Sequence, residues 1–163
     1  MSLISSFLTI KEYSGDKAIN HAHLSKIAKD PFAKMLKEGK SRFFAIVVLN
    51  KTLGRIILFT DLEDKELADG KSVCYFSNLW VHPKLRGHKI GSKLVRFVEK
   101  EAKKDGFEFL ALGVDTDNDK NINIYKHLGY SDVIKNKSES VFVKDDNGSF
   151  APMKEYFVLM KKL

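Results

Sequence analysis

The chain has 163 residues, of which 44% are hydrophobic and 30% charged, a composition that fits one globular domain over residues 1–163 and excludes disordered and fibrous classes. The formal net charge is +7, but the lysines are spread along the chain and form no basic arm, so we expect no nucleic-acid partner. No apolar run approaches the roughly 20 residues that cross a bilayer and no signal pattern opens the chain, so we expect a cytoplasmic protein without a membrane partner.

The first part of the chain predicts a strand, two helices and a hairpin. Residues 3–10 form an apolar run that ends near a Ser-Gly turn, which indicates a strand. Apolar residues then recur at helical spacing up to Asp30-Pro31, and a second short helix follows. Residues 42–49 and 55–59 are rich in Phe, Ile and Val, and the turn residues 50–54 between them predict a hairpin.

The middle of the chain predicts a parallel strand-helix-strand unit. Residues 61–71 are charged and predict a loop, and residues 72–81 predict a strand that ends before Pro83. An amphipathic helix extends from Ile90 to a glycine-terminated end. Residues 107–114 are an uninterrupted apolar run, the pattern of a strand buried on both faces.

The last part predicts a short helix and further strands. Residues 115–119 offer several N-cap candidates for a helix that Gly129 stops. Strands are expected over 130–135, 141–143 and 156–160. Between the last two, an Asp-Asn-Gly sequence at residues 146–148 predicts a tight turn.

Cysteine and histidine usage argues against disulfide and metal sites. Cys74 is the only cysteine, and its apolar strand neighbours predict a buried side chain, with a reactive thiol as the alternative. His82 and His88 flank a basic loop and are interpreted as surface histidines, with phosphate binding or proton transfer as the alternative. The other histidines are dispersed without a metal-ligand spacing, namely His21, His23 and His127.

The basic loop between the strand and the helix carries the most informative pattern. Backbone N–H groups at a helix start are unpaired and can hold phosphate. Gly87 and Gly91 let the backbone approach a ligand closely, and Arg86 adds positive charge. Neither the P-loop pattern nor the dinucleotide-binding glycine pattern is present, which argues against ATP and dinucleotides. We therefore expect a different phosphate-bearing cofactor.

This segment resembles the acetyl-CoA-binding motif of the GNAT superfamily of N-acetyltransferases, Gln/Arg-x-x-Gly-x-Gly/Ala after a strand ending in Leu-x-Val-x-Pro. Residues 79–83 read Leu-Trp-Val-His-Pro and residues 86–91 read Arg-Gly-His-Lys-Ile-Gly. Lys89 replaces the middle glycine, so it either adopts an ordinary helical conformation or carries strain of roughly 1 kcal/mol or more. Residues 118–130 resemble a second family motif, matched at Asn118, Tyr125, Gly129 and Tyr130, with Asn121 in place of the usual alanine.

The resemblance implies a fold and a set of site residues. The fold would be mixed α/β, with a mostly antiparallel central sheet of about seven strands, a parallel βαβ core and flanking helices. Acetyl-CoA would be the co-substrate, Tyr125 would protonate the departing thiolate, and backbone groups of Leu79 and Val81 would meet the pantetheine arm. The expected cofactor contacts are Leu79, Trp80, Val81, Arg86, Gly87, His88, Lys89, Ile90, Gly91, Ser92, Asn118 and Tyr125.

The general base and the acceptor stay open. Many relatives place a glutamate where this chain has Ser77, so a water chain or a carboxylate from Asp115, Asp61 or Glu63 could take the proton. The segments that shape the acceptor site in the family correspond to residues 28–40 and 137–153, whose acidic residues are only a weak hint. We expect an amine on a small molecule or peptide, and the final strands allow a homodimer.

The main hypothesis is therefore an N-acetyltransferase that transfers an acetyl group to a primary amine by direct attack in a ternary complex. The alternative is a non-catalytic acyl-CoA-binding or regulatory module of the same fold. Lys89 in the glycine position and the missing strand glutamate motivate that alternative.

Overall fold

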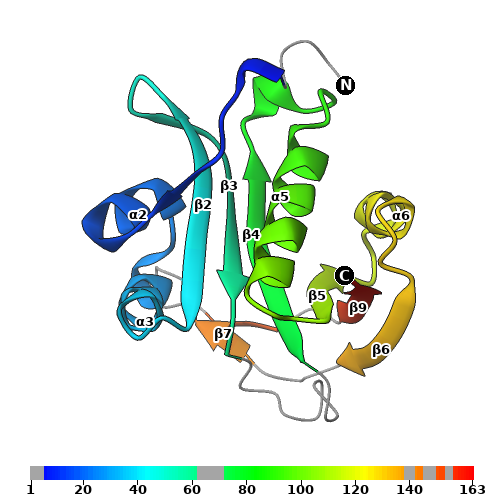
Figure 1. Cartoon of the computed structure of the whole chain (residues 1–163). Helices are drawn as coiled ribbons and strands as arrows, with labels where there is room; N and C mark the ends of the chain where they lie inside the picture. Colours follow the sequence, from blue (N-terminus) through cyan, green and yellow to red (C-terminus); the bar gives the residue numbers. More distant parts are fainter. Residues whose placement is uncertain (1–5, 62–71, 138–141, 145–149, 153–155) are drawn as a thin grey trace.

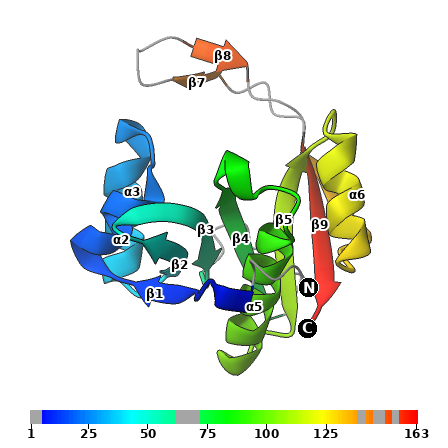
Figure 2. The ribbon, with the colours of Figure 1, turned by 90° about the horizontal axis from the view of Figure 1, so that it is seen from above.

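The computed structural model describes residues 6–61, 72–137, 142–144, 150–152 and 156–163. Its seven-stranded sheet has the order β1-β2-β3-β4-β5-β9-β6 (Figure 1). Neighbouring strands are antiparallel except β4 and β5, which are parallel, so the predicted fold class is confirmed. The strands of this sheet are β1 (Lys11–Tyr13), β2 (Ser41–Val48), β3 (Lys51–Phe59), β4 (Val73–Val81), β5 (Phe109–Asp115), β6 (Asp132–Lys137) and β9 (Tyr156–Lys162). A separate two-stranded sheet consists of β7 (Phe142–Lys144) and β8 (Phe150–Pro152) (Figure 2).

Helices cover both faces of the main sheet. Because side chains alternate along a strand, β2 directs Phe43 toward the N-terminal helices and Phe44 toward the central helix. The first pair of helices, α2 (Gly15–Ala22) and α3 (Lys26–Lys37), lies on one face. The central helix α5 (Ile90–Lys104) and α6 (Asp119–His127) lie on the other face.

The central helix α5 connects the two parallel strands, as the sequence predicted. Its residues Ile90, Leu94, Val98 and Ala102 are buried and repeat every four positions, so they form one stripe that packs on the sheet. A Cβ atom added at Gly54 would lie 3.1 Å from Leu94 Cδ1. Glycine at this position of β3 therefore lets the helix approach the sheet closely.

The first strand lies later in the chain than predicted. Residues 8–10 have no regular secondary structure and residues 1–5 lie outside the described part, so the predicted strand over 3–10 is wrong where the structure tests it. The strand is β1, in which Tyr13 pairs with Phe43 of β2. The side chain of Leu8 packs against the core, but Leu8 does not join the sheet. Pairing with β2, and not apolarity, decides where this strand forms.

The two N-terminal helices are divided at a different place. The break is at residues 23–25, where His23 has a φ of 49° and ends α2, and Pro31 lies inside α3. A proline removes one helical hydrogen bond. Phe32 beside it is buried, with its ring 6.1 Å from the Phe43 ring, and this packing outweighs the local cost.

The β2–β3 hairpin is tighter than predicted. Its turn consists of Leu49 and Asn50, with φ values of 47° and 61°, the conformation of a two-residue type I′ turn. The strand β3 therefore begins at Lys51, and residues 51–54 belong to the strand and not to the turn.

The remaining elements agree with the predictions within a few residues. The strand over 72–81 corresponds to β4, the strand over 107–114 to β5, and the last strand to β9. β6 begins two residues later than predicted, and β8 was not predicted. Cys74 is buried, which confirms its assignment to the core. Most of the predicted loop at 61–71 and the turn at 146–148 lie outside the described residues.

Candidate active site

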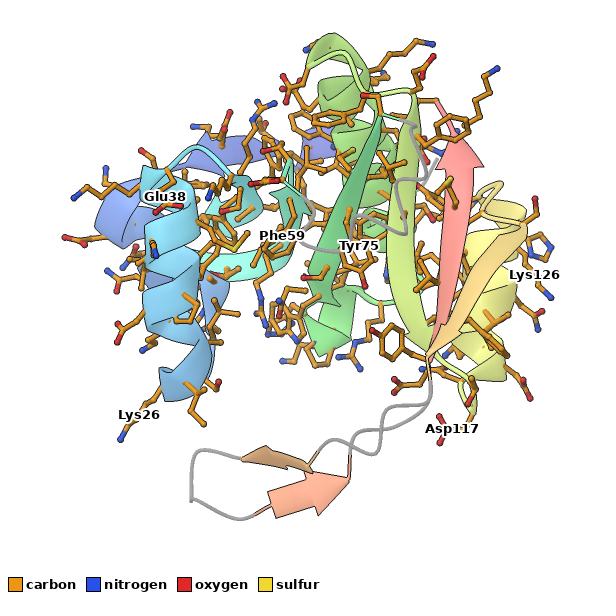
Figure 3. The ribbon with its side chains drawn as sticks, turned by 90° about the horizontal axis from the view of Figure 1, so that it is seen from below. Lys26, Glu38, Phe59, Tyr75, Asp117 and Lys126 are labelled. Atoms are coloured by element: carbon orange, nitrogen blue, oxygen red, sulfur yellow. The ribbon has the colours of Figure 1, made fainter. Side chains whose placement is uncertain are left out.

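The parallel strands β4 and β5 are paired only in their first halves. The pairing ends at Phe76↔Leu112, whereas β4 continues to Val81 and β5 to Asp115. Beyond this point β4 pairs with β3 and β5 pairs with β9. The two strands diverge toward their C-terminal ends (Figure 3). We call this divergence the fork.

A β-bulge in β4 lies at the start of the fork. Ile57 of β3 is opposite Ser77, but Arg55 is opposite Trp80, so β4 has one residue more than β3 in this stretch. Asn78 has a φ of 53°, in the left-handed region. The extra residue changes the alternation of side chains, and Ser77 and Trp80 both lie on the face that carries α2 and α3.

A main-chain donor of β4 points into the fork. The His82 N–H donates to the Leu53 carbonyl of β3 at 2.9 Å. Because amides of an antiparallel strand point alternately toward and away from the partner strand, the Val81 N–H points away from β3. The Val81 carbonyl accepts a 3.1 Å hydrogen bond from Arg86 Nε. The Val81 N–H is therefore available at the open side of β4.

The start of α5 has unpartnered amides beside this donor. No side chain caps the helix, and in the described chain no acceptor is recorded for the N–H groups of Ile90, Gly91 or Ser92. Gly91 lies against Val81, because a Cβ added there would be 3.7 Å from Val81 Cγ2. These amides and the dipole of a helix of 15 residues favour an anionic group at this end.

The loop before α5 contains the strained backbone that was one of the two expected conformations of Lys89. Lys89 precedes the helix with a φ of 61°, so it does not adopt the ordinary helical conformation, and Gly87 has a φ of 81°. Arg86 and Lys89 are exposed, whereas the ring of His88 contacts the Arg86 carbonyl through Nδ1 at 3.1 Å. The positive side chains can thus reach a ligand on the helix start.

Tyr125 lies where the pairing of β4 and β5 ends. Its ring centroid is 6.1 Å from that of Phe76, the last paired residue of β4, and 6.4 Å from that of Tyr130. Burial raises the pKa of Tyr125. Within the described residues its hydroxyl has no hydrogen-bond partner. The phenol is therefore held as a protonated group at the closed end of the fork.

Asn118 and Tyr130, two other positions of the second motif, have structural contacts. Asn118 caps α6, since its Oδ1 accepts from the Asn121 N–H at 3.1 Å. Tyr130 is fully buried and donates to Glu99 Oε1 at 2.9 Å, and Lys161 donates to the same oxygen. Asn118 thereby fixes the start of the helix that carries Tyr125, and Tyr130 belongs to the core.

Tyr75 and Tyr156, on the face of the sheet opposite α6, were not identified from the sequence. Tyr75 of β4 reaches across β5, because a Cβ added at Gly113 would lie 2.5 Å from its hydroxyl oxygen and 3.3 Å from Tyr156 Cδ2. Burial, and secondarily the nearby phenols of Tyr156 and Tyr125, raises the pKa of Tyr75 to about 12. No spacing signal links Tyr75 and Tyr156, because they come from two strands, β4 and β9, and meet only after the sheet forms.

Comparison with known proteins places the chain in a family. Residues 9–130 match the acetyltransferase (GNAT) family, a region that contains both the α5 loop and α6. The chain belongs to the GNAT family of acetyltransferases. A search of curated protein sequences found no significant match.

Solved GNAT-fold structures resemble the chain over nearly its full length. An acetyltransferase from Elizabethkingia anophelis with acetyl-CoA bound has 17% identity and a TM-score of 0.64, with 96% of this chain and 98% of that chain covered. A Bacillus subtilis acetyltransferase in complex with CoA has 16% identity and a TM-score of 0.63, covering 96% and 99%. The ribosomal-protein-S18-alanine N-acetyltransferase from Escherichia coli has 17% identity and a TM-score of 0.69, covering 94% and 92%. These likenesses concern the fold.

The carboxylates considered as the base of this GNAT chain lie in different places. Asp115 is exposed at the end of β5, on the diverging part of the fork, opposite Tyr156 of β9. Asp61 follows β3 and lies 3.8 Å from Lys40. Glu63 lies outside the described residues. At the bulge itself, Asn78 Nδ2 donates to Ser77 Oγ at 3.3 Å, and neither side chain is a base.

A pocket of about 710 Å³ opens on the face of β3 and β4 that carries α2. His21 and His23 both contact the buried Thr52 hydroxyl there, at 3.0 and 3.2 Å. The two rings meet because α2 ends at Ala22 and the left-handed conformation of His23 turns its side chain back. The sequence analysis had treated these histidines as dispersed. Among the described residues, no three His, Cys, Asp or Glu side chains are placed to hold a metal ion.

The side chain of Trp80 also lines this pocket, under the guanidinium of Arg55 at 4.9 Å. Its indole is half-buried and lies on the face of the sheet that carries α2, because it lines the pocket together with α2 residues and is opposite Arg55. Of the described helices, none combines the length and apolar character needed to cross a bilayer.

Proposed function

We propose that this GNAT acetyltransferase transfers the acetyl group of acetyl-CoA to a primary amine by direct attack in a ternary complex. One observation carries the proposal: the fork has unpartnered main-chain donors at its open end and a protonated phenol at its closed end. The family membership and the fold neighbours with bound acetyl-CoA and CoA support this assignment.

The start of α5 fits the diphosphate of the co-substrate. The amides of Gly91 and Ser92 lack acceptors in the described chain, and Arg86 and Lys89 add positive charge next to them. A diphosphate on a helix N-terminus replaces water as the acceptor for these amides and interacts favourably with the dipole. The backbone of Leu79 and Val81 is then the natural wall for the pantetheine arm, because beyond Phe76 no described strand pairs with β4 on that side.

Acyl transfer requires a polarised carbonyl and a stabilised leaving group. The Val81 N–H points into the fork and is the donor we assign to the thioester oxygen. We assign the Tyr125 hydroxyl as the hydrogen-bond donor to the thioester sulfur, which leaves as the CoA thiolate. Since its pKa is raised by burial, whereas a thiol has a pKa of about 8.5, the phenol stabilises the thiolate mainly by donating a hydrogen bond and does not need to lose its proton.

Direct transfer is favoured over an acyl-enzyme. Cys74 is the only cysteine of the chain, and burial raises its pKa to about 12. The thiolate, which is the nucleophilic form, is therefore scarce at neutral pH, and Cys74 is enclosed in the core. The amine must then attack the thioester itself, after losing its proton to water or to Asp115 at the edge of the fork.

Binding of the co-substrate is the first test. Acetyl-CoA at 100 times its dissociation constant should stabilise the folded chain by about 2.7 kcal/mol, which corresponds to a rise in melting temperature of about 5–11 °C for a domain of this size. Gly91→Glu places a carboxylate beside the α5 amides, where it suits the helix dipole but repels diphosphate. The stabilisation should be lost in Gly91→Glu and reduced less in Gly91→Gln, which adds the same bulk without the charge. Equal stabilisation of both variants, or none of the wild type, contradicts the proposal.

Turnover tests the role of Tyr125. Removing a hydrogen bond to a charged group costs about 1.5–3 kcal/mol, so Tyr125→Phe should lower kcat about 10-fold to 150-fold and leave acetyl-CoA affinity unchanged. Tyr130→Phe is the control, because it loses the bond to Glu99 and should lower stability more than kcat. Unchanged turnover of Tyr125→Phe excludes the phenol from the mechanism.

A non-catalytic acyl-CoA-binding module is the second candidate, favoured by the absence of a base at Ser77 and Asn78. The same protein preparation separates the two, since stabilisation by acetyl-CoA without release of CoA across a broad amine panel supports the module. The proposal also includes a cytoplasmic location and leaves room for a homodimer through the edge strand β6.

A further inference from the structure

The pocket between α2, β3 and β4 has one sign of charge. Its described lining includes the cations Lys17, Lys51 and Arg55, and three histidines, and no Asp or Glu of the described residues belongs to it. A solvated surface of a chain with 21 acidic residues normally mixes both signs. A concave site lined by one sign of charge raises the local concentration of ligands of the opposite sign.

Arg55 is the strongest indication of a missing anion. Its Nε atom is buried and has no hydrogen-bond partner, and no carboxylate contacts its guanidinium within the described residues. Its recorded neighbour is the Trp80 ring, at 4.9 Å. Buried donors are nearly always satisfied in folded proteins, so the unpartnered Nε of this half-buried side chain indicates a missing acceptor. Arg42, the other arginine of the N-terminal sheet, bonds three carboxylates.

The histidines extend the donor set. His21 Nδ1 and His23 Nε2 both contact the Thr52 hydroxyl, so the opposite ring nitrogens, His21 Nε2 and His23 Nδ1, have no partner in the described chain. Burial, and next the positive charge of Arg55, lowers the pKa of His23. An anion between these groups would accept a hydrogen bond from Arg55 Nε and would favour the protonated form of His23. Because the Thr52 hydroxyl has a single hydrogen, at most one of the two neutral rings has a hydrogen on its free nitrogen. The site thus combines a guanidinium with one imidazole N–H, and a second ring nitrogen can donate once its ring is protonated.

The location of the pocket connects it to the transfer reaction. Trp80 lines the pocket, and its neighbour Val81 directs its N–H into the fork. Ser77 at the bulge lies on the same face as Trp80. The diphosphate site is on the α5 side of the sheet, so a ligand in the pocket approaches the fork from the other face.

We infer that this pocket binds an oxyanion group, a carboxylate or a phosphate, carried by the amine acceptor. The inference rests on the proposed function, because it assigns the acceptor side of the same fork. The acceptor would then be a zwitterionic small molecule or an acidic peptide end, with the anion held by Arg55 and the histidines and the amine free to reach the thioester. A purely cationic polyamine would be a poor substrate, since it meets a positive pocket.

A binding experiment tests the pocket without any turnover. The full chain carries 13C-labelled histidine and is saturated with CoA, so that phosphate cannot report from the α5 amides. Inorganic phosphate and acetate are then titrated while the ring signals of His21 and His23 are followed, assigned with His21→Gln and His23→Gln. We expect both signals to shift saturably in the wild type and not in Arg55→Met, with Lys100→Met, an exposed change of equal charge, behaving like the wild type. Absence of a shift, or an equal shift in Arg55→Met, overturns the inference.

Turnover distinguishes this inference from the proposed function. Amines are tested in matched pairs, each α-amino acid or aminoalkyl phosphate beside its neutral amide or ester. We expect kcat/KM to favour the anionic member about ten-fold or more, and Arg55→Met to remove that preference without changing acetyl-CoA affinity. Acetylation without preference refutes the anion site and leaves the acetyltransferase proposal intact. Failure to bind acetyl-CoA refutes the proposed function, and the histidine titration, repeated in Gly91→Glu, still decides the pocket.

Discussion

Replacing Lys89 by glycine should remove backbone strain before α5, although it also removes a side chain from the proposed ligand site. Lys89 has a φ of 61° and a ψ of 17°, a left-handed conformation that costs an L-residue about 1–2 kcal/mol. Glycine avoids this cost, but it loses more backbone entropy on folding than alanine does, which costs about 0.5–1 kcal/mol. The difference predicts that Lys89→Gly is more stable than Lys89→Ala by about 0.5–1 kcal/mol.

The alanine variant isolates the backbone effect. Both variants remove the same positive charge from the start of α5, where the helix dipole disfavours cations, so the charge cancels in the comparison. Urea unfolding of the two unliganded variants measures the difference directly, and thermal melts should differ by about 1–4 °C. If the glycine variant is no more stable than the alanine variant, the left-handed conformation of Lys89 is not the native one.

The same pair of variants separates strain from ligand binding. Both should bind CoA more weakly than the wild type and with a smaller dependence on salt, because one cation next to the diphosphate is lost. Their affinities should be equal, since glycine and alanine leave the same amides exposed. A clear advantage of the glycine variant in affinity would mean that the loop changes its path on binding.

Three further predictions concern the rest of the fold. Gly113→Ala should lower the stability by about 1–3 kcal/mol, because its Cβ would lie 2.5 Å from the Tyr75 hydroxyl, and Tyr75→Phe in the same chain should recover part of that loss in a double-mutant cycle. Cys74 should resist a thiol reagent at pH 8 until the chain unfolds, since burial raises its pKa to about 12; rapid labelling of the folded chain would contradict its buried position. Arg42→Met should cost about 2 kcal/mol near pH 7 and less at pH 3. The hydrogen bond from Lys104, and next the one from Arg42, lowers the pKa of Glu101 below its ordinary value of 4.5. The Glu101 carboxylate therefore contributes stability above about pH 4.5, and this contribution is lost as the pH falls through its folded pKa. Urea unfolding at both pH values measures the change, and an equal cost at both would refute the prediction.

The parts of the fold that the sequence predicted are those governed by local physics. The apolar stripe of α5 has a period that a helix presents on one face, and the apolar run before Asp115 is typical of a doubly buried strand. The predictions failed where packing outweighs local preference. Pro31 suggested a helix end, but the burial of Phe32 keeps α3 intact, and Gly54 suggested a turn, but it faces Leu94 inside β3.

The candidate site divides in the same way. The loop from Arg86 to Ser92 and the position of Tyr125 are readable from the sequence, because a helix start exposes its amides wherever the helix lies and because both motifs are contiguous. The fork, the direction of the Val81 N–H and the meeting of Arg55 with His23 are not. They depend on strand register, on a bulge and on the approach of residues far apart in the chain, and only the assembled sheet determines these.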